Sequence, residues 1–205
     1  MAELTVTDIG KLREEKRGFS QTFDLTVNFI GLDLKKPENR IREQIKLPHK
    51  VRDPKVCFIT DILSPVAEKS GQKVLSKNDL GLKPRKAKTL ARDYDIFAVE
   101  APLMPAAAKE LGRYLGPRNK QMAPVPPALK DVGPLIEGYG KAVQINVIKS
   151  QTIQIPIGKD SLNDKQILEN YNYAFEKIQA KLAEKKAQIK SVYLKTTMGK
   201  PMKVM

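Results

Sequence analysis

Apolar and polar residues alternate along two stretches near the beginning of the chain. Every second residue from Phe23 to Phe29 is apolar, and a second alternating run extends over Ile41–Leu47. Successive side chains of a β-strand point to opposite faces, so each run predicts a strand with one apolar and one polar face. Two such strands close together are typical of an antiparallel sheet with one solvated face. Ahead of them, the charged run Lys11–Arg17 predicts a helix, with Thr5 and Asp8 at capping spacing.

The pattern changes in the middle of the chain. Residues 55–60 and 95–99 form short, almost continuously apolar runs, as in strands that are buried on both faces. Candidate helices lie at 64–70, 85–92, 105–115 and 132–139. The alternation of buried strands and helices predicts a small, mostly parallel α/β domain of the three-layer, Rossmann-like type.

Alternating strands return near Ala142. They cover 143–147 and 153–157, after which Asp164 opens a long helix. Apolar residues recur along this helix at helical spacing: Ile167, Tyr171, Ala174, Ile178 and Leu182. The one-sided strands thus occupy both ends of the chain. The sequence therefore predicts a discontinuous α+β domain, an antiparallel sheet with helices built from residues 1–53 and 148–205, interrupted by an inserted α/β domain over 54–147.

Composition adds a strongly basic charge to this picture. The 205 residues include 37 Lys and Arg against 23 Asp and Glu, a formal net charge of +14. Such an excess favours a polyanionic partner, without choosing between DNA, RNA and an anionic membrane. No stretch approaches the roughly 18 apolar residues that a spanning helix requires, and no secretory signal is visible. With a single cysteine, Cys57, these features predict a protein of the reducing cytoplasm that does not span a membrane.

The most informative stretch is the C-terminal run over 190–198. The period of a strand places Ser191, Tyr193, Lys195 and Thr197 on one face. Hydroxyls, a cation and an aromatic ring can bind sugar and phosphate groups and pack against a base. An ordinary edge strand with a polar solvent side would show the same pattern, so periodicity alone leaves both interpretations open.

Several motifs give the chain a resemblance to a known family. They are the loop Leu115–Lys120, Gly158 and Lys159 leading into the helix with Glu169 and Asn170, the tail Ser191–Gly199 with its Thr-Thr-Met-Gly sequence, and the shorter segments Asn39–Arg42 and Leu47–His49. Over essentially its full length, the chain resembles the first protein of the large ribosomal subunit, in its archaeal form. That family also has one domain interrupted by another.

The resemblance implies a structural ribosomal protein and not an enzyme. Members of the family bind large-subunit ribosomal RNA at the mobile stalk near the tRNA exit site and assist the release of deacylated tRNA. Many also bind their own messenger and repress its translation. The expected partners are therefore large-subunit ribosomal RNA, the chain's own messenger RNA and, transiently, exit-site tRNA. The chain is expected in the cytoplasm on the large ribosomal subunit and as a monomer off the ribosome, with no membrane partner, no cofactor and no metal.

The candidate RNA contacts come from two sources. The resemblance maps the family's principal contacts onto Phe23, Ser191, Thr197, Met198 and Gly199. The residues themselves add Arg42 and Lys46 from one strand face, the loop residues Lys149 and Lys159, and Lys195 of the C-terminal strand. For each cation alone, a solvated surface charge is the simple alternative. Phe23 shares its face with apolar residues, so a core position is as well supported as a position bordering the RNA.

The sequence departs from the family pattern in one loop, and it leaves two alternative functions open. Gln121 and Ala123 alter the usual passage of the loop after Lys120 to Met-Pro. A ribosome-associated RNA-binding relative could share the fold without entering mature ribosomes. An α/β enzyme acting on phosphate esters could use Asp61, which follows a buried strand, although an Asp that opens the next helix explains this residue as well. Against the enzyme, the sequence has no metal-ligand set and no phosphate-binding glycine loop.

Overall fold

The chain folds into two compact units. The computed structural model describes residues 4–13, 18–61, 72–81, 83–126, 131–148 and 150–205. Met1–Arg52 and Gly140–Met205 form the first unit, and Asp53–Tyr139 form the second. The sequence pattern had placed the return to the first unit at residue 148. The division falls earlier because strand β7 (Ala142–Val147) pairs antiparallel with β2 (Ile41–Lys46) along its whole length.

A four-stranded antiparallel sheet forms the larger part of the first unit. Its order is β10-β9-β1-β8, and its strands are β1 (Thr22–Ile30), β8 (Thr152–Lys159), β9 (Gln188–Thr196) and the short β10 (Met202–Lys203). β1 pairs with both β8 and β9, so it is a central strand. The alternation predicted for β1 is confirmed, because its apolar residues from Phe23 to Phe29 are buried and the intervening residues are partly exposed.

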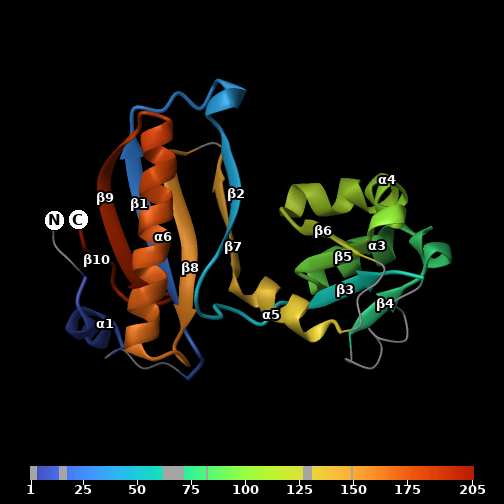
Figure 1. Cartoon of the computed structure of the whole chain (residues 1–205), viewed down its shortest axis with the longest axis horizontal. Coiled ribbons are helices and arrows are strands. Elements are labelled where there is room, and N and C mark those ends of the chain that lie inside the picture. The colour runs from blue at the N-terminus through green and yellow to red at the C-terminus, as the bar shows by residue number, and fades with distance from the viewer. Residues whose placement is uncertain (1–3, 14–17, 62–71, 82, 127–130, 149) are drawn as a thin grey trace. The chain divides into compact units, whose positions relative to one another are not determined.

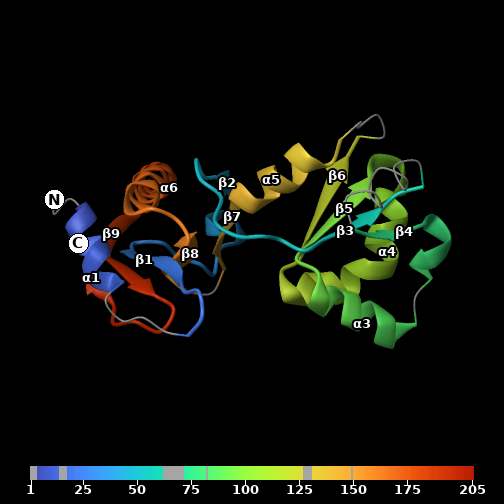
Figure 2. The ribbon, with the colours of Figure 1, turned by 90° about the horizontal axis from the view of Figure 1, so that it is seen from below.

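Helix α6 (Asp164–Glu184) covers the apolar face of this sheet (Figures 1 and 2). The predicted stripe from Ile167 to Leu182 is buried in one core with the apolar residues of β1. β2 and β7 reach the same core through residues such as Ile45 and Ile145. The helical period of 3.6 residues therefore gave the buried face of α6 correctly.

The first helix lies earlier than the sequence suggested. Helix α1 is Val6–Leu12, whereas the charged run Lys11–Arg17 was expected to be helical. Thr5 is its N-cap residue, and the Asp8 carboxylate accepts hydrogen bonds from the Thr5 N–H at 3.3 Å and from the Thr5 hydroxyl at 2.6 Å. The capping pair thus marks the start of the helix itself. Residues 14–17 lie outside the described part of the chain.

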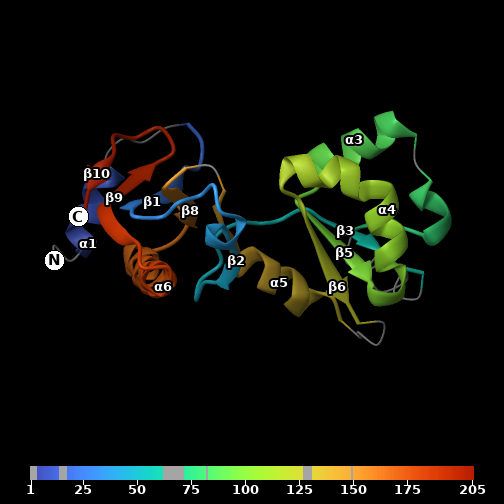
Figure 3. The same ribbon diagram turned by 90° about the horizontal axis from the view of Figure 1, so that it is seen from above.

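The second unit contains a parallel sheet between two layers of helices. The sheet has the order β4-β3-β5-β6, with β3 (Val56–Ile59), β4 (Lys73–Leu75), β5 (Ile96–Glu100) and β6 (Gln121–Val125). Helices α3 (Pro84–Asp93) and α4 (Met104–Leu115) cover one face, and α5 (Gly133–Lys141) covers the other (Figures 2 and 3). Cys57 and Ile59 pack with α3 and α4, whereas Val56 and Phe58 pack with α5. This double cover explains the continuous apolar runs.

Two strands of the second unit escaped the sequence analysis. β4 is very short, and β6 contains Pro124, which is tolerated because β6 lies at an edge of the sheet. The described residues also form short 3₁₀ helices: η1 (Pro37–Asn39), η2 (Lys77–Leu80), η3 (Ala101–Leu103) and η4 (Gly116–Arg118). The helix predicted at 64–70 lies outside the described residues. In the loop after α4, Asn119 is left-handed (φ 52°) and Lys120 Nζ pairs with Asp95 Oδ1 at 2.9 Å, which gives this motif a structural role.

Candidate nucleic-acid interface

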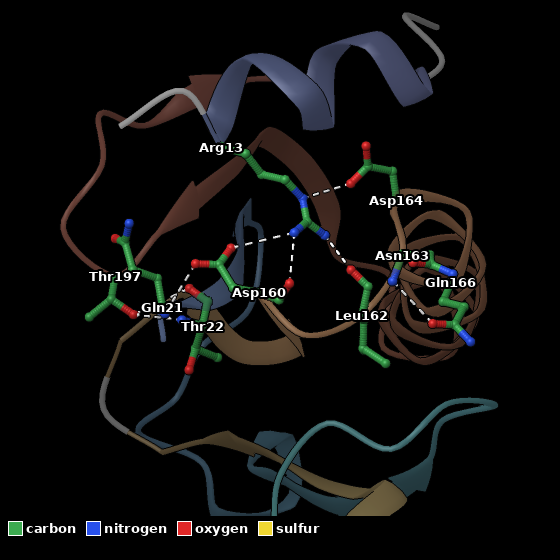
Figure 4. Close-up of polar contacts among 9 residues, drawn as sticks. All are labelled: Arg13, Gln21, Thr22, Asp160, Leu162, Asn163, Asp164, Gln166 and Thr197. Carbon is green, nitrogen blue, oxygen red and sulfur yellow. Dashed lines mark hydrogen bonds and ion pairs between the residues drawn. The ribbon is translucent and has the colours of Figure 1, made fainter. Parts of the chain in front are cut away.

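The end of β9 is joined to the start of β1 by the side chain of Thr197 (Figure 4). The Thr22 N–H donates to Thr197 Oγ1 at 3.0 Å, and Thr197 Oγ1 donates to the Thr22 carbonyl oxygen at 3.3 Å. These bonds continue the β1–β9 ladder beyond the pair Phe23–Thr196, where its regular register ends. Thr197 is therefore fixed in position although its side chain is exposed.

Gln21 holds the next residue, Met198, by its main chain. The Met198 N–H donates to Gln21 Oε1 at 3.1 Å. Gln21 is 2% exposed and is itself fixed, because its N–H donates to Asp160 Oδ2 at 3.3 Å and its carbonyl accepts the Asp160 N–H at 2.9 Å. The Met198 side chain is 61% exposed. A fixed backbone and an exposed apolar side chain suit a contact with a base or ribose.

Gly199 completes a tight turn after Met198. Its N–H donates to the Thr196 carbonyl oxygen at 3.2 Å, and a Cβ at this position would lie 2.1 Å from Thr196 Oγ1. Thr196 is fully buried, so its hydroxyl has little room to move. The turn therefore needs a residue without a side chain, which is a structural reason for glycine here.

Arg13 ties this end of the sheet to the start of α6 (Figure 4). Its guanidinium donates to the carbonyl oxygen of Asp160 at 2.7 Å and to that of Leu162, and it pairs with Asp164 Oδ1 at 2.7 Å. The same guanidinium lies over the ring of Phe23, 5.3 Å from its centroid. Phe23 is fully buried. Of the two positions that the sequence allowed, the structure gives Phe23 the core position, beneath Arg13 and out of direct reach of a ligand.

Phe19 is an exposed aromatic residue that the sequence analysis missed. Its side chain is 53% exposed, and it precedes the buried Gln21 by two residues. An exposed aromatic ring can stack on a base of a nucleic acid. The sequence does contain a signal for Phe19. It follows Gly18 and lies outside the alternating runs and the helical stripes, so no predicted strand or helix would bury it in a core.

The polar face of the sheet continues the site along β1. Asp24 lies opposite Lys195 in the β1–β9 register. Burial raises the pKa of the Asp24 carboxyl, and the charge of Lys195 opposes this rise. Farther along, Ser191 Oγ accepts from Asn28 Nδ2 at 3.0 Å, and Asn28 Oδ1 accepts from the Thr152 hydroxyl at 3.0 Å. Ser191 is only 8% exposed. A ligand on this face would therefore contact mainly the partly exposed side chains beside Ser191, such as Asn28 and Thr152.

The remaining candidates are divided between two places. Lys159, at the end of β8, lies opposite Thr22 and thus at the same end of the sheet as Met198. Arg42 and Lys46 are exposed on β2, in the other sheet. Arg42 lines a cavity of about 320 Å³ with residues from the C-terminal end of α6, among them Lys181 and Lys185.

The length of α6 separates Arg42 from Met198. The helix has 21 residues, roughly 30 Å at the rise of an α-helix. Arg13 links the Met198 end of the sheet to the first residue of α6, Asp164, whereas Arg42 lies near its last turn. The structure therefore does not bring Arg42 together with Thr197 and Met198. Lys149 lies outside the described residues.

Two negative findings apply to the described residues. These residues contain no group of three or more His, Cys, Asp or Glu side chains arranged to hold a metal ion. None of the helices described is both long enough and apolar enough to cross a membrane. At the end of β3, where the enzyme hypothesis placed its acid, the N–H of Asp61 donates to Glu100 Oε2 at 3.2 Å, and the Thr60 hydroxyl donates to the same oxygen at 2.8 Å.

Comparison with known proteins agrees with the motifs at this site. Residues 11–200 match the ribosomal protein L1p/L10e family. The chain is 40% identical to large ribosomal subunit protein uL1 of Thermococcus kodakarensis over 199 residues, which are 95% of this chain and 92% of the relative. It is 40% identical to uL1 of Pyrococcus abyssi, over 95% of this chain and 91% of that protein. It is 35% identical to uL1 of Archaeoglobus fulgidus, over 93% of this chain and 91% of that protein. The resemblance found in the sequence is thereby confirmed, and the chain belongs to the ribosomal protein L1p/L10e family, a family of structural ribosomal proteins and not of enzymes.

Proposed function

We propose that this chain is a component of the large ribosomal subunit that binds ribosomal RNA through the end of the sheet around Met198. We call this the Met198 surface, and we assign to it Phe19, Lys159, Lys195, Thr197, Met198 and Gly199. The relatives named above are proteins of the large ribosomal subunit. The observation that carries the proposal is the anchoring of Met198 by the buried Gln21, which presents an exposed apolar side chain from a fixed backbone.

The chemistry of the Met198 surface suits a folded RNA. Met198 and Phe19 offer apolar and aromatic contacts to ribose and base, which carry specificity in RNA recognition. Lys159 and Lys195 supply charge for phosphates, which carries most of the affinity and little of the sequence preference. Arg42 and Lys46 lie on the other sheet, and we assign them auxiliary phosphate contacts that lie outside this specific site.

The finer function follows from the family resemblance. We propose that the RNA site is at the mobile stalk near the tRNA exit site, and that the protein there assists the release of deacylated tRNA. We also propose that it represses translation by binding a similar fold in its own messenger, as a monomer off the ribosome. One surface would serve both RNAs, so the messenger and the ribosomal RNA should compete for the protein.

The two units divide this work. We propose that the second unit is an inserted α/β domain that folds independently, and that the first unit carries the specific RNA site. The Met198 surface draws on residues before position 53 and after position 139, all within the first unit.

A binding titration tests the proposal. The protein is titrated with the ribosomal RNA site and with an unrelated hairpin of equal length, at 50 and 200 mM salt. If about six phosphates are neutralised, affinity should fall roughly 10³-fold between these salt concentrations, by analogy with duplex DNA. Equal affinity for both RNAs, or binding indifferent to salt, would contradict the proposal. Unlabelled messenger should displace the ribosomal RNA. Sedimentation with intact large subunits distinguishes a ribosomal protein from a ribosome-associated relative.

A further inference from the structure

The second unit carries a cavity that the proposed function does not use. Its volume is about 680 Å³, and it is lined by residues of the edge strand β4, of η2 and of helix α3. Sites for small ligands usually measure about 300 to 1,000 Å³. Val74, Leu75 and Leu90 give the cavity an apolar part. Its size and lining thus match a ligand with an apolar group.

Cations dominate the polar part of the cavity. Lys73, Lys83, Arg85 and Lys86 line it. The acid among the lining residues is Asp79, which accepts the Ser76 hydroxyl at 2.8 Å and the Ser76 N–H at 3.2 Å. Within the described part of the chain, none of Lys83, Arg85 and Lys86 forms an ion pair. The cavity therefore has an excess of positive charge.

The position of these cations opposes the dipole of α3. Lys83 is the N-cap residue of α3, and Arg85 and Lys86 lie in its first turn, which contains no acidic residue. In contrast, the first turns of α1 and α6 contain Asp8 and Asp164. The N-terminal end of a helix carries partial positive charge, which repels cations and attracts anions. A bound anion would relieve this repulsion, and its charge would complement both the helix end and the cations.

We propose that this cavity binds one nucleotide of a single-stranded RNA. The phosphate lies against Lys83, Arg85 and Lys86, and the base lies against the apolar part formed by Val74, Leu75 and Leu90. A nucleotide joins a phosphate to a base whose flat faces can pack against apolar side chains, in one ligand unit. An acidic peptide carries its charge and its larger apolar groups on separate side chains, and inorganic phosphate leaves the apolar part empty. This second RNA site is separate from the Met198 surface and does not depend on it.

Amide NMR of the full chain tests this proposal residue by residue. The titrant is a 5′-phosphorylated uridine pentanucleotide, which is too short to fold. We expect the amides of Val74, Thr89 and Leu90 to shift with a common dissociation constant. The double variant Lys83→Gln and Lys86→Gln should raise that constant by on the order of tenfold, because two phosphate contacts are lost. The amide spectrum of each variant shows directly whether it is folded.

A matched variant separates a site from general charge. Lys88→Gln with Lys109→Gln removes the same charge from exposed positions of the same unit that do not line the cavity. This pair should leave the constant nearly unchanged, and equal weakening by both pairs would overturn the proposal. So would an absence of shifts at the three amides. Inorganic phosphate or an acidic peptide binding there as tightly as the pentanucleotide would also overturn it. Binding at the Met198 surface is followed in the same spectra by separate amides.

Discussion

Gln21 and Met198 are 177 positions apart in the sequence, yet the Gln21 side chain accepts the main-chain N–H of Met198 at 3.1 Å. The bond fixes the backbone of Met198 from the buried side, while its side chain is 61% exposed. Anchoring and ligand contact are thus carried by different atoms of the same residue. The side chain can be removed without disturbing the hydrogen bond that holds the segment.

Met198→Ala should therefore weaken RNA binding without weakening the fold. We expect a loss of about 1 to 3 kcal/mol in binding free energy, the range of interface residues that matter most. The free energy of unfolding should barely change, because the lost side chain is mostly exposed in the free protein. A binding titration and urea unfolding on one preparation measure both quantities.

Met205 offers a matched control for this substitution. Its side chain is 41% exposed, and it contacts β9 through main-chain bonds with Val192. Met205→Ala should leave RNA affinity unchanged. If Met198→Ala and Met205→Ala bind RNA equally well, Met198 is not part of the RNA site.

Gly199→Ala should disrupt the turn that carries Met198. The added Cβ would lie 2.1 Å from Thr196 Oγ1, so either the buried hydroxyl or the turn must shift. We expect weaker RNA binding and lower stability. Removing the hydroxyl by Thr196→Ala should restore part of both losses in the double variant. A double-mutant cycle measures this coupling, and simple additivity would show that the steric conflict is not the cause.

Gly112→Ala is the control for replacing a glycine by alanine where the added Cβ causes no clash. Gly112 lies inside α4, and a Cβ there would meet nothing within 4 Å. This substitution should stabilise the protein slightly, because alanine favours a helix over glycine. RNA binding should be unaffected.

The spacing of apolar residues predicted much of this architecture from the sequence. The alternation over Phe23–Phe29 gave the buried face of β1, and the stripe from Ile167 to Leu182 gave that of α6. Periodicity reports which face is buried but not which strands are neighbours. The pairing of β7 with β2 is a long-range contact, so the pattern gave the strand at 143–147 but not its place in the first unit.

The site was less predictable for the same reason. Motif resemblance pointed to Thr197, Met198 and Gly199 directly. Gln21 has no signal in the sequence, because its function depends on a contact with a residue at the other end of the chain. Arg42 was predicted as an RNA contact from its charge and its strand face, and only the cavity that it shares with Lys181 and Lys185 shows that it lies near the far end of α6. Alternation alone does not distinguish a buried Phe23 from one at the edge of the RNA site, because its burial depends on Arg13, which covers its ring from another part of the chain.

Asp24→Asn should make the fold more stable at neutral pH. Burial raises the pKa of Asp24 above its usual 3.8. At pH values between the usual pKa and the raised pKa of the folded state, the folded state binds more protons than the unfolded state. The free energy of unfolding therefore falls as the pH rises through this interval. Asparagine removes this titration. The gain should be present at pH 7 and disappear below the usual pKa, as measured by urea unfolding across that range.

Lys195→Gln provides a variant of opposite sign. The charge of Lys195 lowers the pKa of Asp24, so its removal should raise that pKa further and reduce stability at pH 7. If Asp24→Asn is instead less stable than the unmodified protein at pH 7, the Asp24–Lys195 attraction outweighs the burial of the carboxylate.

Removal of residues 53–139 should leave a folded protein that still binds the ribosomal RNA site. The two chain segments that enter and leave the second unit lie side by side in the first. Val51 and Arg52 both donate their N–H groups to the Gly140 carbonyl oxygen, at 3.0 and 3.3 Å. A short Gly-Ser linker can therefore join Arg52 to Gly140 at little entropic cost. Cooperative urea unfolding and an RNA titration measure the two outcomes.

The isolated second unit completes this test. It has its own parallel sheet with helices on both faces, and its apolar clusters draw on residues of the unit itself, so it should fold alone. It should bind the ribosomal RNA site only weakly, because the Met198 surface belongs to the first unit. The shortened protein should lose some affinity with the cations of the second unit, since each phosphate contact contributes to binding. An unfolded shortened protein, or specific affinity residing in the isolated second unit, would contradict both the domain division and the assignment of the RNA site.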